Sequence, residues 1–111
     1  MITYTNDMKI KLLGVDPHTI AQHTEVSLEC AAEMAAGARR VLGTDLAIST
    51  TGYAGPGGGT ERDPVGTVYV GIATQDGARA YRLSYSSGKT REFIRKAAAS
   101  KAMMLLLEAI R

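Results

Sequence analysis

The sequence predicts an α/β fold, with three α/β/α layers around a mixed, mainly parallel sheet that includes an antiparallel hairpin near residues 66–85. Residues 46–50 begin almost fully apolar, as a strand covered on both faces would. The hairpin is indicated by two strand-like runs joined at Gln75-Asp76-Gly77-Ala78, because Asp-Gly tolerates the positive φ of a tight turn. Amphipathic helical patterns at 27–42 and 90–109 then make helices on both faces of the sheet the economical assembly.

The N-terminal part is expected to be mostly helical. Residues 2–5 have β-branched and aromatic character and look like the end of a strand. Asn6 is a good N-cap for a short helix that Gly14 stops. Asp16-Pro17 begins a second short helix, because proline suits the first helical position. Ser27 caps the next helix, whose expected apolar face is Cys30, Met34, Ala38, Val41 and Leu42.

The C-terminal part carries the strongest strand signal, at residues 66–74 (GTVYVGIAT). The antiparallel return at 79–85 should place Ala80 and Arg82 on one face, with Tyr81, Leu83 and Tyr85 on the other. Thr90 caps a long final helix. Its apolar stripe is predicted to be Phe93, Ile94, Ala97, Ala98, Ala102, Leu105, Leu106 and Ala109.

Composition is that of an ordinary globular domain, with 45% hydrophobic and 22% charged residues. The formal net charge of +2 and the scattered basic residues argue against a nucleic-acid partner. The longest apolar run, at 103–107, is too short to span a membrane, and no secretory signal is visible. A single cysteine excludes an internal disulfide, and Cys30 is expected to be a small buried hydrophobe. We expect one cytoplasmic domain over residues 1–111.

The most unusual segment is the loop Thr51-Gly-Tyr-Ala-Gly-Pro-Gly-Gly-Gly-Thr60, which follows a predicted buried strand. So many glycines indicate either close backbone approach or unusual φ/ψ angles. Successive exposed N–H groups, with the hydroxyls of Thr51 and Thr60, would suit phosphate oxygens. A plain surface turn is the alternative. The Walker A and Rossmann patterns both fail, the latter because a strand rather than a helix follows the loop.

Other chemical candidates are weaker. His18 and His23 have no partners in a metal-ligand pattern and suit surface or capping roles, so no metal site is predicted. Residues 61–63 (Glu-Arg-Asp) resemble a solvated loop. Tyr4 and Lys9 lie close enough in sequence to reach one crevice, where a lysine can act as a base and a phenol can donate a hydrogen bond. A packing tyrosine and an exposed lysine are the alternative.

Together these residues resemble the CinA C-terminal domain family, also known as the nicotinamide-mononucleotide (NMN) amidohydrolases. The glycine loop followed by Asp63-Pro-Val-Gly-Thr-Val-Tyr69 carries most of the resemblance. Upstream, Thr3-Tyr-Thr-Asn6, Lys9 and Leu13-Gly-Val15 are similar to the family's T-Y-[ST]-N-x-x-K-x-x-x-L-G-V segment, and His23…Val26-Ser27 to its H-G-x-V-S stretch. Downstream, Gly88, Arg91 and Arg95 resemble a G-[DN]-R-x-x-[IV]-R element, with one extra residue here.

The resemblance implies hydrolysis of the NMN carboxamide to nicotinate mononucleotide and ammonia, without a metal or organic cofactor. In the family, a serine in an S-C-T-G-G element is the nucleophile, and residues matching Tyr4 and Lys9 assist it. The resemblance also implies that NMN is the ligand and that the ribose phosphate lies against the glycine loop, with a homo-oligomer as the expected assembly. The implied binding residues are Thr51, Gly52, Ala54, Gly55, Pro56, Gly57, Gly58, Gly59, Thr60, Arg91 and Arg95.

Three departures from the family pattern bear on activity. Tyr53 and Thr24 stand where the family usually has an aliphatic residue and a glycine. More seriously, no S-C-T-G-G occurs in the 111 residues, so the chain is expected to lack the N-terminal third of the family domain and to be inactive alone. Three hypotheses follow: part of an NMN amidohydrolase, a non-catalytic nucleotide-binding module, or an assembly protein whose exposed sheet edge is covered by another chain.

Overall fold

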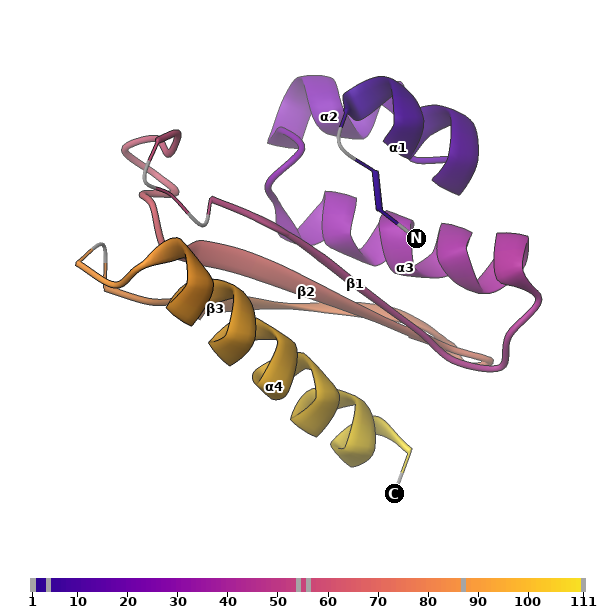
Figure 1. Ribbon diagram of the computed structural model, residues 1–111. Helices are drawn as coiled ribbons and strands as arrows, with labels where there is room; N and C mark the ends of the chain where they lie inside the picture. Colours follow the sequence, from indigo (N-terminus) through magenta and orange to yellow (C-terminus); the bar gives the residue numbers. More distant parts are fainter. Residues whose placement is uncertain (1, 4, 54, 56, 87, 111) are drawn as a thin grey trace.

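The computed structural model describes residues 2–3, 5–53, 55, 57–86 and 88–110. Three helices come first in the chain, then three strands and a last helix (Figure 1). The elements are α1 (Asn6–Leu13), α2 (Pro17–His23), α3 (Leu28–Leu42), β1 (Ala47–Gly52), β2 (Thr67–Thr74), β3 (Gly77–Ser84) and α4 (Arg91–Ala109).

The described strands form an antiparallel sheet in the order β1-β2-β3, with Ile48 opposite Ile72 and Val70 opposite Tyr81. The predicted hairpin is confirmed, but a mainly parallel sheet was the wrong expectation for these strands. Parallel neighbours need a crossover connection, usually a helix. Here the chain returns through the glycine loop after β1 and through a turn of Gln75 and Asp76 after β2, so each strand reverses direction.

Helices lie on both faces of this sheet: α1–α3 on one side and α4 on the other (Figure 1). Alternation along β2 explains how both are held. Val68 packs with Ile94 and Ala98 of α4, whereas the next residue, Tyr69, packs with Val26 and Ala31 on the α3 side. With both faces covered, β2 is buried almost throughout.

A glycine sets the distance between α3 and the sheet. A Cβ placed on Gly71 of β2 would collide with the backbone carbonyl of Ala31 in α3. The Ser49 hydroxyl of β1 donates a hydrogen bond to the same carbonyl. The helix is therefore seated directly on the backbone of β2, beside the strand that leads into the glycine loop.

The helix starts at Asp16, Ser27 and Thr90 are confirmed as N-caps, and Cys30 is fully buried. Several local predictions were wrong, among them the apolar stripe of α4 at Phe93 and Ala109, which are exposed. Thr5, not Asn6, caps α1, because its hydroxyl accepts the Met8 amide hydrogen bond at 3.2 Å. Ile2 and Thr3 are not in a strand. Val41 and Leu42, in the last turn of α3, are about half exposed.

The outer side of β1 pairs with no described strand. In the part of the chain that is described, no helix is long and apolar enough to cross a membrane.

Candidate functional site

The glycine loop is closed at its base by the strands that it joins. The Tyr53 amide donates to the Thr67 carbonyl at 2.9 Å, and the Gly66 amide donates to the Tyr53 carbonyl at 2.6 Å. Gly66 has a φ of 101° and lies against the backbone of Tyr85, where a side chain would not fit. The loop therefore leaves the sheet at a fixed point, just beyond the C-terminal end of β1.

Within the loop, glycines have two different reasons to be present. Gly55, Gly58 and Gly59 have φ values of 85°, 87° and 89°, which favour glycine. Gly57 has no positive φ, and a Cβ there would meet nothing within 4 Å. The backbone therefore requires three of these glycines but does not require the fourth.

The loop offers donors to an anion. Gly57, Gly58 and Gly59 have no amide hydrogen bond to any other described residue. Consecutive free N–H groups of this kind form anion-binding concavities. Tyr53 lies beneath them: its ring would be 3.2 Å from a Cβ on Gly58, and it packs beside the buried residues Val26 and Tyr69.

Lys9 lies at the foot of the loop. It is 8% exposed, and its amine donates to the Thr51 hydroxyl at 3.2 Å. That hydroxyl in turn donates to the Glu25 carbonyl at 2.8 Å. Because its proton is directed at Glu25, the Thr51 oxygen is left to accept from Lys9. The alternative interpretation of the sequence, an exposed lysine, is thus wrong. Thr51 holds the Lys9 amine at the end of β1.

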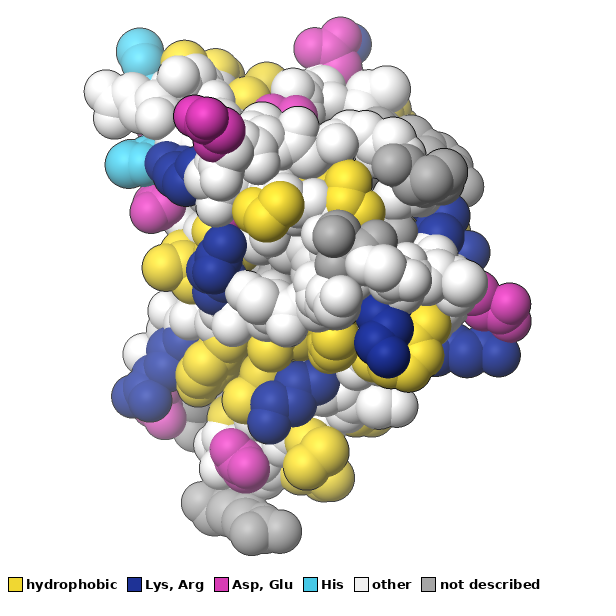
Figure 2. Space-filling view, turned by 90° about the vertical axis from the view of Figure 1, so that its left-hand side faces the viewer, with side chains coloured by type: hydrophobic (Ala, Val, Ile, Leu, Met, Phe, Trp, Pro, Cys, Tyr) yellow, Lys and Arg dark blue, Asp and Glu magenta, His cyan; other side chains and the backbone are white. Residues whose placement is uncertain are grey.

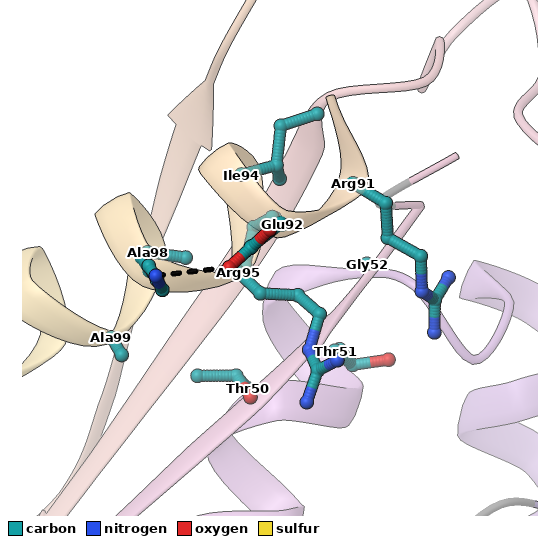
Figure 3. Close-up of a pocket in the computed structure, with 11 residues that line it drawn as sticks. Thr50, Thr51, Gly52, Arg91, Glu92, Ile94, Arg95, Ala98 and Ala99 are labelled. Carbon is teal, nitrogen blue, oxygen red and sulfur yellow. Dashed lines mark ion pairs between the residues drawn. The ribbon is translucent and has the colours of Figure 1, made fainter. Parts of the chain in front are cut away.

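A cavity of about 870 Å³ lies between α4 and β1. Arg91 and Arg95 lie on the same side of α4, one turn apart, and Arg95 extends toward Thr50 and Thr51 (Figure 3). Arg91 donates to the Gly55 carbonyl at 3.1 Å and so holds the loop. Glu92 pairs with Lys96 at 3.0 Å, and Arg95 is left as the arginine of this cavity that has no acceptor among the described residues.

A second cavity, of about 520 Å³, lies on the other face of the sheet between β1 and the helices α1 and α3. Lys9 lines this second cavity, and Thr50, Thr51 and Gly52 line both. The C-terminal end of β1 therefore has a cavity on each face. Figure 2 shows this end of the molecule, where Lys and Arg side chains are spread among apolar ones. Arg95 thus lies on one face of this strand end and the buried amine of Lys9 on the other, and the glycine loop continues from the same end.

Comparisons with known proteins show the family and the fold. The model of the CinA C-terminal domain matches residues 1–110. The chain belongs to the CinA C-terminal domain family. A CinA-like protein of Synechocystis sp. is 48% identical over 104 residues, which are 93% of this chain and 25% of that protein. One from Shewanella amazonensis is 41% identical over 106 residues, 96% of this chain and again 25% of the relative.

Solved structures of CinA relatives have the same fold. The competence/damage inducible protein CihA from Agrobacterium tumefaciens matches with a TM-score of 0.92 and 34% identity, over 98% of this chain and 66% of that one. A competence or damage-inducible protein from Enterobacter asburiae gives 0.92 and 28%, over 100% and 69%. The chain thus spans about a quarter of the curated CinA relatives and about two thirds of the solved ones.

The family's expected site residues are placed as follows. Lys9, Thr51, Gly52, Gly55, Arg91 and Arg95 surround the end of β1, and Gly57, Gly58, Gly59 and Thr60 continue from it along the loop. Tyr4, Ala54 and Pro56 lie outside the described residues, so their predicted roles stay predictions.

Thr60 differs from Thr51 in its hydrogen bond: the Thr60 hydroxyl oxygen accepts from the Asp63 amide at 3.0 Å. No group of three His, Cys, Asp or Glu side chains among the described residues is placed to hold a metal ion.

Asp63 is a buried residue that the sequence pattern did not predict. Residues 61–63 were expected to be a solvated loop, and Glu61 and Arg62 are exposed, but Asp63 is only 3% exposed. Its carboxylate accepts from the Tyr69 hydroxyl at 2.7 Å. Burial first, and then this hydrogen bond, raise the pKa of Tyr69, so the phenol remains a donor at neutral pH. Tyr69 is an inward position of β2 by the alternation of side chains along the strand. A buried tyrosine hydroxyl needs a hydrogen-bond partner, and this was the signal in the sequence that could have indicated Asp63.

Proposed function

We propose that this chain supplies the nucleotide-binding part of an NMN amidohydrolase, which converts the NMN carboxamide to a carboxylate and releases ammonia. The observation that carries the proposal is the set of groups around the end of β1. Arg95 lines the cavity on one face there, the buried amine of Lys9 lines the cavity on the other, and the glycine loop continues from the same end. Membership of the CinA C-terminal domain family supports it.

Each end of the substrate then has a partner. The loop amides and Arg95 bind the phosphate, since planar guanidinium groups favour phosphate oxygens. Arg91 does not need to reach the substrate, because its guanidinium holds the loop through Gly55. Lys9, positioned by Thr51, accepts the proton of the attacking hydroxyl.

The chemistry is acyl transfer. A serine oxygen bonds to the carboxamide carbon, the C–N bond breaks, and ammonia leaves with a proton from Lys9. Water then cleaves the resulting ester and gives the acid. The serine belongs to an S-C-T-G-G element that the 111 residues do not contain, so it must come from additional polypeptide. No metal or organic cofactor enters this proposal. We propose the cytoplasm as the place of the reaction.

A chimera tests this proposal. The part of the Agrobacterium relative that precedes the matched region is fused ahead of this chain, and ammonia release from NMN is measured for the chimera and for the chain alone. We expect turnover by the chimera and none by the chain. A chimera that folds but leaves NMN intact would contradict the amidohydrolase proposal.

The second candidate is a nucleotide-binding module without catalysis, which the absence of the nucleophile element favours. Calorimetric titration of the chain alone with NMN distinguishes it. Binding by the chain together with an inactive chimera would support the module. Absence of both binding and turnover would leave an assembly role.

A further inference from the structure

The return half of the glycine loop is attached to the sheet through the buried carboxylate of Asp63. Its Oδ1 accepts from the Tyr69 hydroxyl of β2 at 2.7 Å and lies 3.7 Å from Arg82 Nε of β3. Its Oδ2 accepts from Arg62 Nε at 3.3 Å. A loop residue is thus fixed to both neighbouring strands by one charged group.

The two arginines extend this network on either side. Arg82 donates through Nε to the Tyr69 oxygen at 3.2 Å and through Nη2 to the Arg62 carbonyl at 3.2 Å. Arg62 donates to the carbonyl of His23, the last residue of α2, at 3.1 Å. The segment 62–63 is therefore held by β2, β3 and α2 together.

Asp63 also orders the backbone that leads to the glycines. Its amide donates to the Thr60 hydroxyl at 3.0 Å, and the Thr60 amide donates to the Asp63 carbonyl at 2.9 Å. Thr60 directly follows Gly57, Gly58 and Gly59, whose amides have no hydrogen bond to another described residue. Next to it, a Cβ on Gly59 would lie 2.8 Å from the Val65 amide, so this part of the loop has little room to shift.

Burial of a carboxylate is unfavourable unless the charge is paired and hydrogen-bonded, and an apolar residue would pack at lower cost. A buried charge with several fixed partners does, however, hold one geometry. The two guanidiniums also leave the network net positive, so Asp63 does not repel an anion at the loop.

From these contacts we propose that Asp63, with Tyr69 and Arg82, is a positioning residue that holds the glycine-loop amides in the geometry that receives the ligand phosphate. The identity of the ligand rests on the proposed function above. The positioning itself does not, and it can be measured without ligand.

The test compares the wild type with Asp63→Asn, which keeps the size of the side chain but removes its charge. Hydrogen exchange followed by mass spectrometry reports on the loop, and NMN titration reports on binding. We expect faster exchange in peptides covering 57–62, unchanged exchange in α3 and α4, and NMN affinity lower by about ten-fold. The control is Asp76→Asn, an exposed acid in the β2–β3 turn, which should change neither readout.

Because Asp63→Asn can destabilise the whole chain, Tyr69→Phe is measured beside it. This variant keeps the ring and the carboxylate and removes the two hydrogen bonds of the phenol, the one donated to Asp63 and the one accepted from Arg82, so the same local increase in exchange is expected at smaller size. Unchanged loop exchange in both variants, or an equal increase over loop, α3 and α4, would overturn the positioning role. A wild type that shows no NMN binding would contradict the proposed function, while loop exchange would still decide the role of Asp63.

Discussion

At the scale of single residues, a substitution of Lys9 best distinguishes an effect on stability from an effect on catalysis. Its amine is buried, has one neutral acceptor in Thr51, and forms no ion pair with an acid among the described residues. A buried amine with so few partners is expected to add little to stability. We therefore expect Lys9→Met to change the unfolding free energy by no more than about 1 kcal/mol, while turnover in the chimera falls by roughly a hundred- to ten-thousand-fold.

Thermal unfolding and ammonia release measure the two effects of Lys9→Met. The matched control is Lys11→Met, an exposed lysine on the same helix, for which turnover should be unchanged. Retained turnover in Lys9→Met would mean that Lys9 is a packing residue and that another group removes the proton.

At the scale of elements, a substitution of Gly57 can distinguish a glycine loop that binds a ligand from one that only forms a turn. Its φ is not positive and a Cβ would have open space, so Gly57→Ala should leave the fold and the unfolding temperature unchanged. If a phosphate lies against the loop backbone, the added methyl group should lower NMN affinity on the order of ten-fold, or about 1.4 kcal/mol. Gly88→Ala, also without a positive φ and free of close contacts, is the control. Equal affinity in both variants would favour the turn.

Some features of the elements could be predicted from the sequence and others could not. Caps at Asp16, Ser27 and Thr90 and the alternation of 80–85 depend on neighbouring residues, so the pattern alone predicted them. The antiparallel pairing of β1 with β2 depends on the path of the loop, which no periodicity encodes. The same holds for the site. Lys9 was a candidate from the sequence, but its contact with Thr51, and the Asp63 network, join residues that only folding brings together.

At the scale of the whole molecule, the two edges of the sheet differ. The β3 edge carries the exposed charges of Arg79 and Arg82, which discourage pairing with another strand. The β1 edge (Ala47–Gly52) carries no charged residue, pairs with no described strand on its outer side, and has a cavity on each face. The expected homo-oligomer should therefore form through β1, as strand pairing between two copies related by a two-fold axis.

Sedimentation velocity of the chain alone should then show a concentration-dependent dimer. Thr50→Lys places a charge on the exposed side of β1 and should give a monomer, because a lysine on the edge opposes strand addition. Thr74→Lys, at the end of the central strand β2, is the control and should still dimerise. In the chimera the added segment would compete for the same edge, so dimerisation should weaken there as well. A dimer that survives Thr50→Lys would place the contact elsewhere, with the exposed apolar side of α4 at Met103, Met104 and Leu107 as the next surface to test.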